Sequence, residues 1–86
     1  MITKKMTIQI LTGLEARPVA MLVQVASRYE SSIYIERNEK KVNAKSIIGV
    51  MGLGLAVGEE VIVSANGEDE KEAIENIEKY LTTEEA

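Results

Sequence analysis

The amino-acid sequence predicts an α+β domain in which helices cover one face of a four-stranded, largely antiparallel sheet. Two observations predict this fold class. Short segments with the period of strands alternate with segments of helical spacing, and their order is βαββαβα. The chain has 86 residues, which is enough for one hydrophobic core and too few for two. We therefore expect residues 1–86 to form a single domain.

The N-terminal part of the chain is predicted to form a strand and then a helix. Met6, Ile8 and Ile10 alternate with polar residues, which predicts a strand over residues 5–10 with one buried face. Pro18 suits the first turn of a helix, because backbone N–H groups there have no partner within the helix and proline has no N–H. A single apolar stripe then follows at helical spacing, formed by Val19, Leu22, Val23 and Ala26.

The middle of the chain is predicted to form a hairpin and a short helix. Residues 33–35 are β-branched or aromatic, residues 38–40 have the composition of a tight turn, and residues 41–44 return as a short strand. Ser46 precedes a cluster of apolar residues and is predicted to cap a helix of one to two turns. The glycines that follow keep this helix short.

The C-terminal part is predicted to form one more strand and the longest helix. Val61, Val63 and Ala65 alternate with Ile62 and Ser64, which predicts a strand over residues 61–65. Asp69 and Glu72 have the spacing of a capping box at the start of a helix. We expect residues 82–86 to form a frayed acidic tail. The helical stripe between them consists of Ala73, Ile74, Ile77, Tyr80 and Leu81.

The composition excludes several classes of function. A net charge of −4 argues against direct binding to nucleic acid, which requires clustered lysine and arginine. Without histidine or cysteine, the chain cannot build a Ser-His-Asp or Cys-His site or the usual zinc site, so we expect no enzyme, no cofactor and no metal. No apolar run is long enough to span a membrane. We expect a cytoplasmic protein that binds other proteins.

Three motifs resemble those of a known family. Residues 13–18 read GLEARP, residues 41–50 read KVNAKSIIGV, and residues 67–70 read GEDE. Together with the order of the elements, they make the chain similar to HPr, the histidine-containing phosphocarrier of the bacterial sugar phosphotransferase system, over residues 6–81. The resemblance implies an open-faced β-sandwich, in which three helices cover one face of a four-stranded antiparallel sheet.

One departure from the family decides what the resemblance implies about activity. The family places its phosphorylated histidine just before Ala-Arg-Pro, where this chain has Glu15, and the chain contains no histidine. It is therefore similar to the branch of catabolite-repression HPr-like regulators, although that branch usually has glutamine there. The alternative is a phosphotransferase-system HPr with a natural or engineered His-to-Glu change, which is inactive or mimics phosphohistidine. A carboxylate at a helix start is also favoured by the helix dipole alone.

The resemblance also implies a regulatory site. In the family, the serine that corresponds to Ser46 is phosphorylated by HPr kinase/phosphorylase, and the phosphoprotein then binds a LacI-type catabolite control repressor as corepressor. At a helix start, the added negative charge meets the positive end of the helix dipole, so the fold should tolerate it. From the residues alone, Ser46 remains a simple helix cap.

The resemblance further implies a partner-binding surface, which consists of Arg17, Ala20, Lys45, Ile47 and Met51. We expect Ile48 to pack into the core instead, because the apolar side chains of this short helix cannot all face solvent. The lysines at positions 40, 41 and 45 either steer an acidic partner or form a solvated face. Exchange of the first strand between two copies would give a weak homodimer, which nothing in the residues requires.

Overall fold

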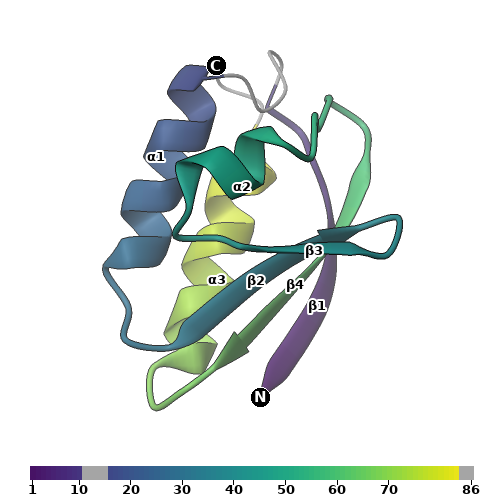
Figure 1. Cartoon of the computed structure of the whole chain (residues 1–86). Coiled ribbons are helices and arrows are strands. Elements are labelled where there is room, and N and C mark those ends of the chain that lie inside the picture. The colour runs from purple at the N-terminus through teal and green to yellow at the C-terminus, as the bar shows by residue number, and fades with distance from the viewer. Residues whose placement is uncertain (11–15, 84–86) are drawn as a thin grey trace.

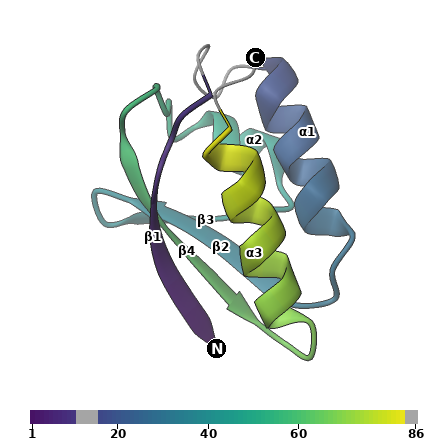
Figure 2. The same ribbon diagram turned by 180° about the vertical axis from the view of Figure 1, so that it is seen from behind.

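The structure, a computed structural model, describes residues 1–10 and 16–83, and its elements follow the predicted order βαββαβα. The elements are β1 (Ile2–Thr7), α1 (Ala16–Ser27), β2 (Ser32–Arg37), β3 (Lys40–Asn43), α2 (Ile47–Met51), β4 (Glu60–Asn66) and α3 (Glu70–Leu81). Helices α1 and α3 lie side by side across one face of the sheet, and α2 lies against α1 and β3 (Figures 1 and 2). None of the helices in this described part is long and apolar enough to cross a membrane.

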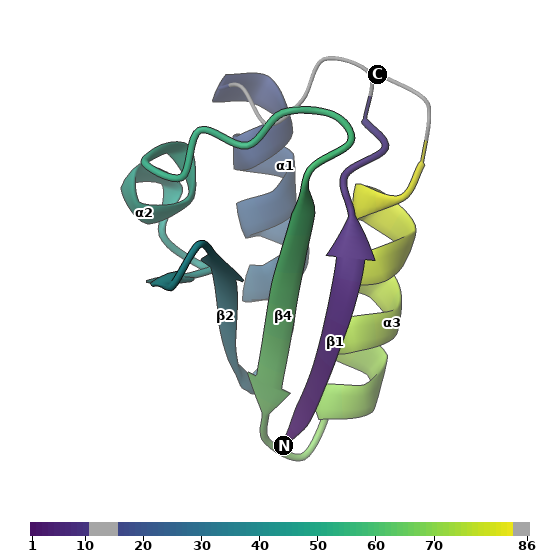
Figure 3. The ribbon, with the colours of Figure 1, turned by 90° about the vertical axis from the view of Figure 1, so that its right-hand side faces the viewer.

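The four strands form one antiparallel sheet in the order β1-β4-β2-β3. The register aligns Met6 with Val61 and Ile35 with Val63, so that the apolar residues of neighbouring strands share a face. Figure 3 shows that the opposite face carries no helix. The fold class predicted from the sequence is therefore confirmed, including the single layer of helices.

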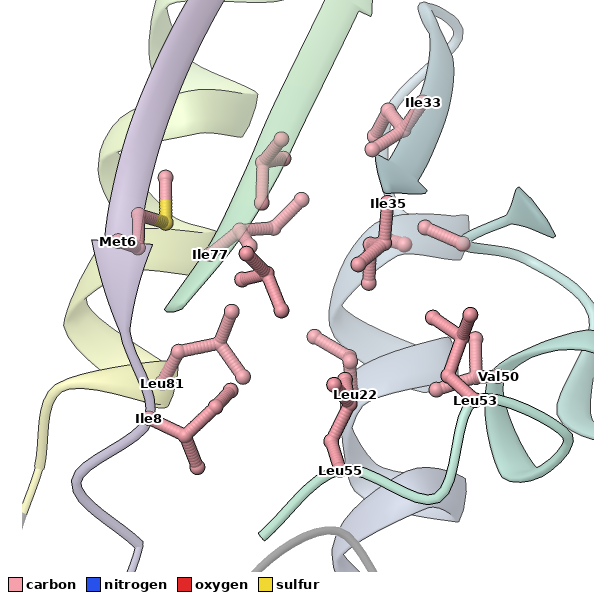
Figure 4. Packing of buried hydrophobic residues seen from close by; sticks show 14 of the residues in the cluster. Met6, Ile8, Leu22, Ile33, Ile35, Val50, Leu53, Leu55, Ile77 and Leu81 are labelled. Carbon is pink, nitrogen blue, oxygen red and sulfur yellow. The ribbon is translucent and has the colours of Figure 1, made fainter. Parts of the chain in front are cut away.

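The hydrophobic core lies between the sheet and the helices. Leu22 of α1, Ile77 of α3 and Ile35 of β2 all belong to it, and each of these side chains is fully buried (Figure 4). The predicted stripes of both long helices are confirmed. In the first stripe Val23 is only partly buried, and in the second Tyr80 is only partly buried.

The predicted boundaries of the first strand were wrong. The strand runs from Ile2 to Thr7, because its partner β4 begins at Glu60, which pairs with Thr7. Ile8 and Ile10 are nevertheless buried, as the alternation predicted. Beyond the end of the strand, the backbone forms hydrogen bonds with other segments instead of regular strand pairs. The Ile8 N–H, for example, donates to the Glu59 carbonyl at 2.8 Å.

The turn between β2 and β3 is tighter than predicted. Asn38 and Glu39 both have positive φ, at 50° and 67°, which is the geometry of a two-residue type I′ hairpin turn. Lys40 is already the first residue of β3, which ends at Asn43, one residue before the predicted end.

The predicted capping box at the start of α3 was wrong. Asp69 is the N-cap residue, but its carboxylate makes no cap bond to the helix. It instead accepts hydrogen bonds from the backbone N–H groups of Glu30 and Ser31, at 2.9 and 3.0 Å, and from the Ser31 hydroxyl. The Glu70 carboxylate reaches back to the Gly67 N–H at 3.1 Å. Asp69 therefore joins the start of α3 to the loop before β2.

These hydrogen bonds make part of the stability depend on pH. The Ser31 hydroxyl, followed by the Glu30 N–H, holds the pKa of Asp69 below its ordinary value of 3.8. A carboxyl whose pKa is lower in the folded state stabilises the fold above pH 3.8, and that stabilisation is lost as the pH falls through the folded value. We expect Asp69→Asn to lower the free energy of unfolding near neutral pH and to lower it much less in acid.

Urea unfolding of the wild type and of Asp69→Asn, each near neutral pH and in acid, measures how the difference in the free energy of unfolding changes with pH. Glu68→Gln is the matched control, because Glu68 is an exposed neighbouring carboxylate in the same turn. An Asp69→Asn deficit that stays constant between neutral pH and pH values well below 4 would contradict the assignment.

Candidate functional site

Ser46 lies at the start of α2, where it caps the helix as predicted. Its backbone is extended, with φ −109° and ψ 114°, and its Oγ accepts a hydrogen bond from the Gly49 N–H at 3.1 Å. A Cβ atom on Gly49 would lie only 3.3 Å from Ser46 Oγ, so glycine leaves room around the hydroxyl. The side chain is half-buried. The hydroxyl is therefore held at a fixed place at the edge of the surface.

The turn that precedes Ser46 is held by hydrogen bonds on both sides. Asn43 Oδ1 accepts from the Lys45 N–H at 2.8 Å, and the Asn43 carbonyl accepts from the Ser46 N–H at 3.0 Å. Ala44 is fully buried, and its N–H donates to the Ile33 carbonyl. This turn connects Ser46 directly to the core, so its position does not depend on α2 alone.

A continuous stretch of chain brings apolar side chains to the surface next to Ser46. Helix α2 has only five residues and buries just one of them, Val50. Ile47 and Met51 are exposed, as expected, but the expectation that Ile48 packs into the core was wrong, because its side chain is 87% exposed. Val50 fills the core position instead, since residues two apart in one helical turn point to different sides.

Helix α1 carries a further exposed apolar residue, Met21. The two helices contact each other, as Figures 1 and 3 show. We refer to the exposed side chains of Met21, Ile47, Ile48 and Met51 as the apolar surface. Exposed apolar side chains on neighbouring helices are typical of surfaces that bind other proteins.

The other residues predicted to bind partners lie on the same two helices or beside them. Arg17 is exposed in the first turn of α1, and Ala20 is half-buried one turn later. Lys45 is only partly exposed, because its Nζ donates to the Tyr29 carbonyl at 2.7 Å, just beyond the end of α1. Glu15 lies outside the described residues.

The segment that follows α2 is tied to the sheet by one side chain. Arg37, the last residue of β2, donates from Nη1 to the Leu53 carbonyl at 2.9 Å, and its Nε lies 2.6 Å from Glu59 Oε2. Glu59 Oε2 is buried and accepts no hydrogen bond from the described residues, so the nearby Arg37 guanidinium compensates its charge without a well-aligned hydrogen bond. Both ends of the segment between α2 and β4 are therefore anchored to β2.

Sequence reasoning missed two members of the apolar surface. Met21 lies outside the apolar stripe of α1, and an apolar residue outside the stripe of an amphipathic helix is expected to face solvent. That signal was present in the sequence. No such signal existed for Ile48, because a single helical turn is too short to establish a period.

Comparison with known proteins identifies the family. The model for the PTS HPr component phosphorylation site matches residues 2–83. The chain belongs to the HPr family. It is 46% identical over 84 residues to the HPr-like protein Crh of Bacillus subtilis (strain 168), covering 98% of this chain and 99% of the relative. The HPr-like protein Crh of Halalkalibacterium halodurans is 43% identical over 84 residues, covering 98% of this chain and all of the relative.

Solved structures show the same fold. The crystal structure of HPr-C-His from Thermoanaerobacter tengcongensis has a TM-score of 0.93 and 45% identity, covering 98% of this chain and 94% of the other. The crystal structure of Bacillus subtilis Crh has a TM-score of 0.79 and 45% identity, covering all of this chain and 99% of the other, and is described as a domain-swapped, intertwined dimer. The HPr-like identity inferred from the motifs is therefore confirmed.

The candidate site is defined by the kinds of side chain that its described residues carry. Within residues 1–10 and 16–83, no three His, Cys, Asp or Glu side chains are grouped closely enough to hold a metal ion. Helix α2 and its cap provide a positioned hydroxyl and exposed apolar side chains, and the neighbouring helix α1 provides the exposed Arg17 and Met21. A surface of this kind can bind a protein and can change its affinity when charge is added to the hydroxyl.

Proposed function

We propose that this protein is an HPr-like regulator of carbon catabolite repression that HPr kinase/phosphorylase phosphorylates on Ser46. The phosphoprotein then acts as corepressor by binding a LacI-type catabolite control repressor. Its similarity to two proteins named Crh, one of them described as a catabolite repression protein, supports the class of function. The observation that carries the specific proposal is the Ser46 hydroxyl, fixed at the border of the apolar surface.

Physical chemistry supports Ser46 as a switch. A phosphate brings about −1.5 to −2 charge, and backbone N–H groups at the start of a helix favour that charge. The modification therefore adds a charged anchor next to the apolar surface without opposing the fold. Basic side chains of a repressor would pair with the phosphate, and apolar side chains would pack against Ile47 and Met51.

The experiment that tests the proposal uses two variants of Ser46. The wild type, incubated with HPr kinase and ATP, is expected to gain the mass of one phosphate and then to bind the repressor. Ser46→Ala and Ser46→Asn are expected to gain none. Asn retains the capping oxygen while Ala loses it, so Asn separates loss of the hydroxyl from loss of the cap, which costs about 0.5–2 kcal/mol.

Ser27→Ala is the matched control, because Ser27 is an exposed serine at the end of α1. It is expected to be phosphorylated like the wild type. The proposal is wrong if the Ser46 variants gain the same phosphate as the wild type, or if the wild type gains none.

We further propose that the protein does not relay phosphate. The family's phosphoryl group travels on a histidine ring nitrogen, and this chain has no histidine, with Glu15 at the corresponding position. A carboxylate could form an acyl phosphate, which would make the chain a variant phosphocarrier. Labelled phosphoenolpyruvate and the first enzyme of the phosphotransferase system distinguish the two, because a carrier acquires label and a regulator does not.

Self-association is a second property that the relatives support. Structures of Crh and of HPr from Thermoanaerobacter tengcongensis are described as dimers. Within the part of the chain that the structure describes, β1 is an edge strand that pairs with β4 alone, so an equivalent strand from a second copy could replace it. We propose a weak homodimer of this kind, which size exclusion over a range of concentrations would detect.

A further inference from the structure

Methionine is the residue most open to mild oxidation in this chain. The sequence has four methionines and no cysteine, histidine or tryptophan. A peroxide therefore reacts first with thioether sulfur. Which methionines it reaches depends on their exposure to solvent, and in this respect the four residues differ widely.

Two of the methionines belong to the apolar surface. Met21 on α1 and Met51 on α2 are each 46% exposed. Met6, in contrast, lies on β1 with its side chain in the core and is 3% exposed (Figure 4). Met1 is exposed at the N-terminus, which lies at the opposite end of the molecule from α2 (Figure 1). Among the methionines, only Met21 and Met51 combine exposure with a place in the apolar surface.

We propose that Met21 and Met51 are sites of reversible oxidation by hydrogen peroxide, and that their sulfoxides weaken binding of a protein partner to the apolar surface. In each reaction the thioether sulfur takes one oxygen atom from the peroxide, the O–O bond breaks, and water is released. The sulfur is oxidised and the peroxide is reduced. The effect on partner binding rests on the proposed function, whereas the pattern of oxidation does not.

The location of the two residues determines what oxidation changes. A sulfoxide is polar and accepts hydrogen bonds, so it must give up water when a partner covers it. In the free protein nearly half of each residue is exposed, which allows a sulfoxide oxygen to stay in contact with water. Oxidation should therefore lower affinity while leaving folding unchanged. Methionine sulfoxide reductases restore the thioether, which makes the change reversible.

The first part of the test maps the oxidation. The folded protein is treated with hydrogen peroxide, and peptide mass spectrometry follows the addition of one oxygen atom at each methionine. Met21 and Met51 are expected to react at least about tenfold faster than Met6, which must wait for local opening of the core. Equal rates at all four methionines, or a Met21 and Met51 pair as slow as Met6, would overturn the proposal.

The second part measures the consequence of oxidation for binding. A double variant, Met21→Leu with Met51→Leu, keeps the size and apolar character of both side chains but cannot be oxidised. Peroxide treatment is expected to weaken repressor binding of the Ser46-phosphorylated wild type by about tenfold or more and to leave the double variant unchanged. Equal loss in both proteins, or no loss in a fully oxidised wild type, contradicts the proposal.

A separate readout distinguishes failure of this inference from failure of the proposed function. If the reduced phosphoprotein does not bind the repressor at all, the proposed function is wrong. Retention on a hydrophobic-interaction column then decides the inference. Oxidation must shorten the retention of the wild type and not that of the double variant, with the thermal unfolding of both unchanged.

Discussion

Replacing Ile48 by Asn is expected to weaken repressor binding of the Ser46-phosphorylated protein by about 30-fold while leaving its thermal unfolding nearly unchanged. The side chain is 87% exposed, so the folded protein gains little from it. A partner that covers the apolar surface would bury it, and burial of such a side chain contributes about 2 kcal/mol. Asn is neutral, so the substitution adds no charge beside the phosphate.

The measurement compares dissociation constants for protein that mass spectrometry shows to be fully phosphorylated. Tyr34→Thr is the matched control, because Tyr34 is also an exposed apolar side chain but lies on the helix-free face of the sheet. It is expected to bind like the wild type. Wild-type affinity in the Ile48 variant would show that the apolar surface is not the contact.

Replacing Gly67 by Ala is expected to lower the free energy of unfolding by about 2–3 kcal/mol, a large share of the stability of a small domain. A Cβ atom at this position would lie 2.5 Å from Ser31 Oγ and 2.7 Å from Ser31 Cα. Ser31 is buried, and its hydroxyl and N–H both donate to Asp69. Relief of the clash must therefore displace backbone and disturb the connection between α3 and β2.

Thermal and urea unfolding measure this loss, which corresponds to a fall in Tm of roughly 10–20 °C for a domain of this size. Gly52→Ala is the control, because Gly52 has a helical φ of −64° and a Cβ there meets its nearest neighbours at 3.4 Å. Its stability is expected to stay within about 0.5 kcal/mol of the wild type. A Gly67 variant as stable as the Gly52 variant would show that the turn adjusts without cost.

The secondary structure followed from local patterns because each pattern reflects a local cause. The alternation of Met6, Ile8 and Ile10 predicted which side chains are buried, and their burial extends beyond the end of the strand. The strand boundary did not follow, because it depends on where β4 begins. A strand ends where its partner ends, and the partner lies more than fifty residues away in the chain.

The role of Asp69 illustrates the same limit. Its spacing from Glu72 matched a local capping motif, yet its carboxylate binds Glu30 and Ser31 across the fold. A carboxylate at a helix start has several donors within reach, and only packing determines which of them are close. The helix start itself was predicted correctly, because a cap residue marks it whichever bond the side chain makes.

By itself, the sequence determined the element order, the two long apolar stripes, the cap at Ser46 and membership of the HPr family, since all of these depend on residue type and spacing. Only the tertiary structure decided which side chains of α2 face solvent and that α2 contacts α1, the helix that carries the exposed Met21. The physical reason is that a five-residue helix has no period of its own. Its orientation is set by Val50 entering a core built by distant segments.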